Sequence, residues 1–203
     1  MLKVQGNTTA FLLVLVASLC MLDGCGGSYQ LHGTVLNDLK PAPNFTLTGY
    51  NGQTFRLSDQ RGKVVLLFFG YTLCPDVCPT TLADIAAIKR KLGSDAAQVQ
   101  VVFITIDPER DTQERLKRYV TTFDQTFIGL RGTQAELDPV IKAYGVTAIR
   151  HPMPNSAIGY VMDHSAYTYV IDQKGQWREI FSYGTNPDDI TSDIRYLAQE
   201  GTL

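Results

Sequence analysis

Residues 64–81 read VVLLFFGYTLCPDVCPTT, and they set the centre of the fold. Six apolar residues, mostly β-branched or aromatic, end at Gly70, which predicts a central strand covered on both faces. Pro79 has no backbone N–H and fits the first turn of a helix. Apolar residues then continue at spacings of three and four, at Leu82, Ile85, Ile88 and Leu92. We therefore expect a strand, a tight turn and a helix that carries Cys74 and Cys78 at its N-terminus.

The two cysteines of this stretch are candidates for chemistry. Free N–H groups and the positive end of the helix dipole favour a thiolate at a helix N-terminus, although Asp76 between the two sulfurs opposes it. A spacing of four residues brings Cys74 and Cys78 to one side of a helical turn, within reach of one disulfide or one metal ion. Two small buried hydrophobic residues without chemistry are the disfavoured alternative, because structural cysteines rarely flank a proline at a helix start.

The composition is that of an ordinary globular protein. The chain has 203 residues, of which 44% are hydrophobic and 19% charged, enough for one domain with a full core. The formal net charge is −2 and the pI is about 5.9, and no Lys/Arg cluster is interleaved with aromatic residues. These features argue against a nucleic-acid partner.

The N-terminal segment predicts export. Residues 10–21, AFLLVLVASLCM, follow a single Lys3 and match the hydrophobic region of a signal peptide better than a membrane span. We assign residues 1–24 to this signal peptide. The sequence LDGC at residues 22–25 resembles the bacterial lipobox, in which Asp23 departs from the usual small or apolar residue.

Cys25 is accordingly the candidate site of lipidation, with an uncleaved short anchor or plain secretion as alternatives. Residues 25–43 lack periodicity and end in KPAP, which is typical of a lipid-anchored linker that lifts a domain off a membrane. The expected location is the bacterial cell membrane, facing the periplasm or extracytoplasmic space. In that oxidising compartment, Cys74 and Cys78 can cycle between dithiol and disulfide.

Residues 44–203 form the predicted domain. Alternating residues on both sides of the Asn-Gly turn at 51–52 predict a small N-terminal hairpin. Residues 99–106 predict a second buried strand, parallel to the first with a right-handed crossover. A helix, a short strand at residues 127–130 and a helix capped by Thr133 follow.

The last part of the domain changes in composition. Residues 145–163 are rich in Pro, Asn, Gly and small residues and predict a long excursion or hairpin over one edge. Residues 166–172 and 177–181 predict an antiparallel hairpin, and a closing helix follows. This order predicts the α/β class: a thioredoxin-like fold with an N-terminal β-hairpin extension and an inserted excursion before the last β-hairpin.

Three separated motifs resemble the Sco/SenC family. They are GYTLCPDVCP at residues 70–79, IDPERDT at 106–112 and DHS at 163–165, and the similarity covers residues 43–197. The resemblance implies a membrane-attached, thioredoxin-like copper-binding protein that assists metallation of cytochrome c oxidase. Leu73 stands where many relatives carry a polar residue, often His, but this departure removes no ligand.

The third motif supplies a further candidate metal ligand. In thioredoxin-like folds, the segment that enters the strand before the final hairpin faces the cysteines and normally holds a cis-proline. Residues 163–165 take that place here, which aims His164 at Cys74 and Cys78. Two sulfurs and one nitrogen suit Cu(I), and can hold Cu(II) if water or a carboxylate completes the site, whereas zinc prefers a fourth protein ligand.

Several acidic residues lie in or near these motifs. Asp107 and Asp111 are expected to cap the helix that follows them. Alternatively, Asp76, Asp107 or Asp163 orients His164 or tunes the basicity of the thiolates.

The remaining candidates surround the site or lie away from it. Tyr71 and Tyr160 are expected at its rim, where they limit solvent access. His151, in the excursion, and His32, in the linker, are interpreted as residues without a ligand role.

The sequence therefore predicts a membrane-tethered copper chaperone rather than an enzyme. Cys74, Cys78 and His164 bind copper and deliver it to, or reduce the thiols of, the dinuclear copper site of a cytochrome c oxidase subunit, as the resemblance implies; other copper or thiol proteins are further partners. The main alternative is a thiol-disulfide oxidoreductase, in which copper binding is incidental. A peroxidase of the peroxiredoxin type ranks third, because residues 71–74 lack the proline which that chemistry expects before the cysteine.

Overall fold

Strand β4 (Val64–Gly70) lies inside the main sheet of the computed structural model, which describes residues 29–200. All seven of its residues are buried, as the apolar run predicts. On one side β4 pairs in parallel with β5 (Val99–Thr105), and on the other it pairs antiparallel with β9 (Tyr167–Ile171). The predicted parallel crossover from β4 to β5 is therefore confirmed.

Eight strands form this sheet in the order β1-β10-β9-β4-β5-β6-β2-β3, and β7 and β8 form a separate two-stranded sheet. The other strands are β1 (Thr34–Pro41), β2 (Thr46–Gly49), β3 (Thr54–Arg56), β6 (Ile128–Arg131), β7 (Ala148–Pro152), β8 (Tyr160–His164) and β10 (Gln176–Ser182). The helices are α2 (Val77–Lys91), α3 (Gln113–Phe123), α4 (Gln134–Ala143), α5 (Pro187–Glu200) and the short 3-10 helices at Leu57–Gln60 and Gly93–Gln98.

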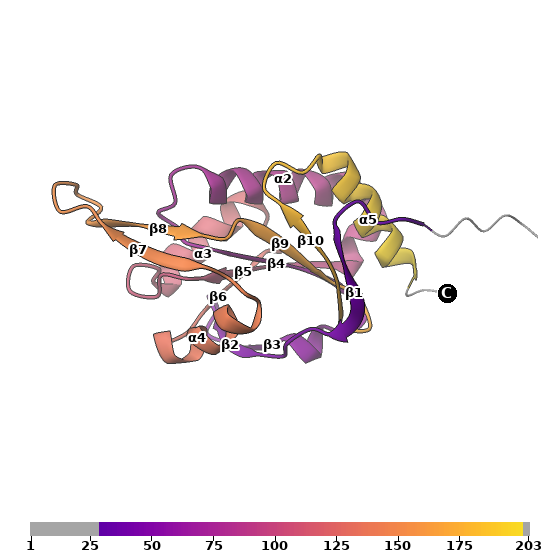
Figure 1. The fold of residues 1–203 in the computed structure, drawn as a ribbon, viewed down its shortest axis with the longest axis horizontal. Helices are drawn as coiled ribbons and strands as arrows, with labels where there is room; N and C mark the ends of the chain where they lie inside the picture. The colour runs from indigo at the N-terminus through magenta and orange to yellow at the C-terminus, as the bar shows by residue number, and fades with distance from the viewer. Residues whose placement is uncertain (1–28, 201–203) are drawn as a thin grey trace, which may run out of the picture. The chain divides into compact units, whose positions relative to one another are not determined.

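Helix α2 is held against the sheet by its apolar face. Leu82, Ile85 and Ile88 are buried, and α2 packs against α5 and α3. Figure 1 shows α2 and α5 along one face of the sheet and α4 on the opposite side. The N-terminus of α2 consequently lies just beyond the end of β4, where the turn between them carries Cys74.

The predicted hairpins are present. Strands β2 and β3 pair as the N-terminal hairpin, and β9 and β10 pair as the last one. The excursion predicted at residues 145–163 forms all of the hairpin β7–β8 except its last residue, His164, and the hairpin projects to the left of the main sheet in Figure 1. Thr133 caps α4 with a complete capping box, as its position before that helix predicts.

One boundary was predicted wrongly. Residues 34–41, assigned to the linker, form β1, which pairs antiparallel with β10 at the edge of the sheet. Val35 and Leu39 are exposed, and the register shifts between Val35 and Lys40, so β1 has no alternating apolar pattern for sequence reasoning to detect. The predictions for residues 1–24 and Cys25 concern a part of the chain outside the described residues. Within residues 29–200, no helix combines the length and the apolar character needed to cross a membrane.

Buried carboxyl groups fasten the entry to β1. The backbone N–H of His32 donates to Asp193 at 2.7 Å, and the Nδ1 atom of its ring lies 2.7 Å from the same carboxylate. The N–H of Gly33 donates to Glu179 at 3.1 Å. Glu179 and Asp193 are both fully buried. Burial and the neighbouring Asp193 raise the pKa of Glu179 to about 8, and the hydrogen bond to Asp193 raises the pKa of His32. His32 is thus part of the fold rather than of a linker.

The raised pKa of Glu179 makes the stability of the wild-type protein dependent on pH. A folded-state pKa of about 8, against an ordinary value of 4.5, means that Glu179 stabilises the fold at low pH and that this contribution is lost as pH rises through about 8. Relative to Glu179→Gln, which keeps an acceptor for Gly33, the wild type should lose free energy of unfolding between about pH 5 and pH 9.

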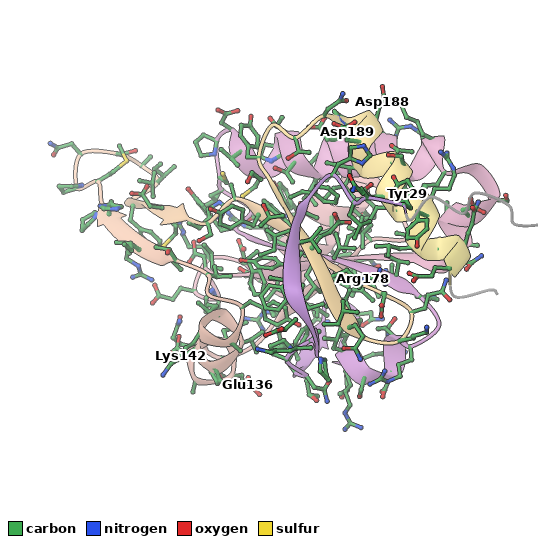
Figure 2. The ribbon with its side chains drawn as sticks, turned by 45° about the vertical axis from the view of Figure 1, so that its right-hand side comes forward. Tyr29, Glu136, Lys142, Arg178, Asp188 and Asp189 are labelled. Atoms are coloured by element: carbon green, nitrogen blue, oxygen red, sulfur yellow. The ribbon has the colours of Figure 1, made fainter. Side chains whose placement is uncertain are left out.

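Urea unfolding of both proteins at several pH values measures this difference. Asp188→Asn is a matched control, since Asp188 pairs with Lys91 at the exposed start of α5, where Figure 2 labels it. A difference between the wild type and Glu179→Gln that stays constant across this pH range would contradict the prediction.

Candidate metal centre

The two cysteines lie on either side of the start of α2. Cys74 is in the turn after β4, where its N–H donates to the carbonyl of Tyr71 at 3.2 Å, and Cys78 is in the first turn of the helix. Cys78 is fully buried, Cys74 is half-buried, and both are free thiols. The backbone N–H of Cys78 points at the Cys74 sulfur, with an N···Sγ distance of 3.4 Å. Hence the helix N-terminus donates to the more exposed sulfur, as predicted.

His164 completes a group of three soft ligands. The ligand atoms of Cys74, Cys78 and His164 all lie within 4.8 Å of one another, and Cys78 Sγ is 3.2 Å from His164 Nε2. Among the described residues, this is the one cluster of at least three histidine, cysteine or acidic residues with such spacing. The structure therefore brings together the three residues that the sequence nominates as ligands.

The orientation of the imidazole is set by the residue that follows it. His164 Nδ1 lies 3.0 Å from the carbonyl oxygen of Ser165, which can only accept, so Nδ1 carries the proton. The lone pair of neutral His164 is then on Nε2, the atom that faces the sulfurs. Phe68 and Tyr71 contact the ring edge-to-face, with centroid distances of 6.1 and 5.9 Å. The imidazole is thus presented as a ligand before any ion arrives.

The two thiols differ strongly in acidity. The hydrogen bond from Cys78, supported by the backbone N–H groups of Asp76 and Cys78, lowers the pKa of Cys74 to about 4. The hydrogen bond to Cys74, burial and the charge of the Cys74 thiolate all raise the pKa of Cys78. At neutral pH the pair therefore holds one proton, with Cys74 as the thiolate and Cys78 as the thiol.

Gly70 gives Cys78 the space it occupies. A Cβ atom at Gly70 would lie 2.7 Å from the Cys78 sulfur and 3.0 Å from the ring of Phe103. The sequence pattern predicts Gly70 only as the end of a strand, not as the neighbour of the Cys78 sulfur. One feature of the sequence could have indicated this contact: a glycine in a buried strand often marks a place where a ligand or another group approaches the backbone closely.

The site opens into a cleft of about 380 Å³. Cys74, Pro75 and Asp76 line one side of it, and Met162 and His164 line the other. Tyr71 also lines the cleft, but its side chain is buried, so it does not form the exposed rim that the sequence predicts. Cys78, in contrast, is buried behind these residues. An incoming ligand consequently meets Cys74 and His164 first.

The aspartates do not take the positions expected of them. Thr112, not Asp107 or Asp111, caps α3 by accepting from the N–H of Arg115. Asp111 is buried instead, and accepts from the backbone and hydroxyl of Thr72 and from the hydroxyl of Thr105. These hydrogen bonds of Asp111 therefore hold in place the turn that carries Cys74.

The carboxylates of Asp163 and Asp107, two of the three aspartates considered as partners of the ligands, bond to residues other than the ligands. Asp163 bonds to His151 at 2.8 Å, because neighbouring strand residues face opposite sides and His164 faces the cysteines. Asp107 bonds to Arg110 and Tyr160, so Tyr160 makes a polar contact and does not line the cleft as predicted. Asp76 is exposed, and what it offers Cys74 is its backbone N–H.

We expect Cys78→Ala to raise the pKa of Cys74 from about 4 towards the ordinary thiol value of 9, because the strongest donor to its thiolate is lost. The pH dependence of alkylation by iodoacetamide measures it, in a chain whose Cys20 and Cys25 are replaced by Ser. His164→Ala should change this pKa much less, because the unprotonated Nε2 does not donate to the thiolate. If Cys74 stays acidic without Cys78, the helix N-terminus alone holds its charge.

Gly70→Ala should lower the free energy of unfolding by about 1–3 kcal/mol, because its methyl group overlaps the Cys78 sulfur. Urea unfolding measures the loss. The same substitution in a Cys78→Ala background should cost less, since the overlapping atom is gone. Equal costs in both backgrounds would show that the aromatic neighbours, not the sulfur, need the space.

The fold and the site together define a class of protein: a thioredoxin-like domain whose cysteine pair faces a histidine. The SCO1/SenC family model matches residues 36–199. An SCO2-like protein of Rickettsia prowazekii is 33% identical over 193 residues, which is 89% of this chain and 92% of that protein. The chain belongs to the SCO1/SenC family, as the resemblance of its motifs predicts.

Solved structures of the same family share the fold. ScoI of Bradyrhizobium japonicum, solved with copper bound, is 39% identical with a TM-score of 0.71, and the match covers 78% of this chain and 99% of that one. An SCO1/SenC family lipoprotein of Bacillus anthracis is 27% identical with a TM-score of 0.68, covering 83% and 99%. These matches confirm the predicted thioredoxin-like fold.

Proposed function

We propose that this protein binds one copper ion through Cys74, Cys78 and His164 and passes it to a partner. The observation that carries the proposal is the presence of two sulfurs and one neutral imidazole nitrogen within 4.8 Å of one another, beside an open cleft. Such a soft, three-ligand set suits Cu(I). The copper-bound ScoI structure, with the same fold, supports the choice of metal.

The protonation of the site fits uptake and release. Cys74 is already a thiolate at neutral pH, and His164 Nε2 already carries a lone pair, so binding displaces only the proton of Cys78. Oxidation of both thiols to a disulfide removes two ligands at once and would release the ion. The redox state of the pair would then act as a switch.

The recipient and the location complete the proposal. Membership of the SCO1/SenC family supports delivery to, or thiol reduction of, the dinuclear copper site of cytochrome c oxidase. A signal peptide at residues 1–24 and a lipid on Cys25 would place the domain at the bacterial cell membrane, facing the periplasm or extracytoplasmic space. The lipoprotein of Bacillus anthracis with this fold supports such an anchor.

The second candidate function is a thiol-disulfide oxidoreductase. The observation that favours it is the lowered pKa of Cys74, about 4, which makes this sulfur a ready thiolate nucleophile. What it leaves unexplained is the contact between His164 Nε2 and the buried Cys78, which nucleophilic attack by Cys74 does not need.

Copper titration of the reduced full chain, without oxygen, separates the two functions. With Cys20 and Cys25 replaced by Ser, the wild-type site should bind one equivalent of Cu(I) in competition with a chelator. Both His164→Ala and Cys78→Ser should weaken it by at least about 10–100-fold, because each removes a ligand. His151→Ala, which lies on the neighbouring strand, is the matched control and should bind like the wild type.

The opposite result would favour catalysis. If copper binding is weak and equal in the wild type and His164→Ala, while His164→Ala still reduces a partner disulfide, the oxidoreductase would be the function.

A further inference from the structure

His164 and the cysteines belong to different parts of the fold. Cys74 and Cys78 follow a strand of the main sheet, whereas His164 ends β8 in the separate sheet β7–β8. The chain itself ties the base of β8 to β9, and the N–H of Ser165 donates to the carbonyl of Thr147 there. The rest of the hairpin projects from the main sheet, so other contacts must set its inclination (Figure 1).

Arg110 makes those contacts. Its Nη1 donates to the backbone carbonyls of Ile158 and Tyr160 at 2.9 and 2.8 Å, and its Nε donates to Asp107 at 2.5 Å. The guanidinium also stacks on the ring of Tyr160, 3.5 Å from its centroid. The Arg110 side chain thus holds the start of β8 through two hydrogen bonds to backbone carbonyls and a stacking contact with Tyr160.

Asp107 closes this clamp from the other side. One of its carboxylate oxygens accepts from Arg110, and the other accepts from the Tyr160 hydroxyl at 2.6 Å. Burial and the hydrogen bond to Asp107 raise the pKa of Tyr160 to about 12, so the hydroxyl keeps its proton and donates. Asp107 is 1% exposed, and its own N–H donates to Thr105 of β5. The clamp is therefore fixed to the main sheet.

Tyr71 connects the clamp to the site. Its ring centroid is 5.7 Å from the Arg110 guanidinium and 5.9 Å from the His164 ring, and its hydroxyl accepts from the backbone N–H of Met162 at 3.3 Å. Tyr160, Met162 and His164 alternate along β8 and face the same side. A tilt of β8 at Tyr160 would thus be passed along the strand to His164.

We propose that Arg110, held by Asp107, is a positioning residue that keeps His164 in contact with Cys78. The measurement of copper affinity described below rests on the proposed function, whereas the measurement on the metal-free protein does not. Asp107, Arg110 and Tyr160 make none of the hydrogen bonds of the ligand atoms, so their effect reaches His164 through the backbone of β8 and the ring of Tyr71.

Arg110→Lys is the substitution that tests the clamp. Lysine keeps a positive charge beside the buried Asp107 but loses the planar stack and the paired donors to the two carbonyls. Arg150→Lys is the matched control, because Arg150 stacks on the same ring at 4.1 Å yet pairs with Glu109 at the surface. Tyr160→Phe removes only the hydroxyl bond to Asp107 and serves as a second, milder variant should Arg110→Lys fold poorly.

The first readout needs no copper. In the reduced metal-free chain, nuclear Overhauser contacts between the His164 ring and the rings of Phe68 and Tyr71 should be present in the wild type and in Arg150→Lys. They should be weakened or lost in Arg110→Lys, and changed in the same direction but less in Tyr160→Phe. Unchanged contacts in both Arg110→Lys and Tyr160→Phe would overturn the inference, whatever the protein binds.

The second readout is a double-mutant cycle on Cu(I) affinity. Arg110→Lys should weaken binding on the order of tenfold when His164 is present and should have no further effect in a His164→Ala background. Equal weakening in both backgrounds would mean that the clamp supports the whole domain rather than His164, and would overturn the inference. A wild type that binds no copper, with the contacts between rings still dependent on Arg110, would overturn the proposed function alone.

Discussion

The contact of 3.2 Å between Cys78 Sγ and His164 Nε2 joins two pieces of structure that the chain builds separately. Cys78 is placed by β4 and α2, whose burial leaves the sulfur no freedom, and Gly70 supplies the space that it fills. His164 is placed by a hairpin outside the main sheet. The site exists only because these two supports are held together, so contacts far from the sulfurs matter to it.

The electrostatics of the site follow from the same arrangement. A buried thiol beside a half-buried one cannot easily lose its proton once its neighbour is charged, so the pair settles with one negative charge on Cys74. The proton that remains on Cys78 is the one that it donates to the Cys74 thiolate, and His164 Nε2 keeps its lone pair because Nδ1 donates to the carbonyl of Ser165. A soft cation replaces that single proton, with little rearrangement of the three ligands.

Sequence reasoning succeeded where a local pattern carries the structure. The apolar run at β4 and the proline near the start of α2 are strong local signals, and they located the cysteines. His164 was found because the order of elements puts its segment opposite the cysteine turn, with the family motifs in support.

Strand β1 was missed because an exposed edge strand pairs through its backbone and needs no apolar alternation. Asp163, one of three aspartates considered as a partner of His164, lies on the other face of β8, as period-two alternation requires. Arg110 was not singled out, since its partners are two backbone carbonyls that lie far along the chain.

The accessibility of the three ligands bears on how a copper carrier of this kind would work. Cys74 and His164 line the open cleft, while Cys78 lies behind them. A partner thiolate that enters the cleft can add to a three-ligand ion before any ligand leaves, so exchange need not pass through a poorly coordinated state. The buried Cys78 would then be the last ligand to dissociate from the ion, because its sulfur must regain a proton that enters through the cleft. Tight binding and ready transfer are compatible in such a site, since the strength of the complex and the access of the incoming ligand depend on different residues.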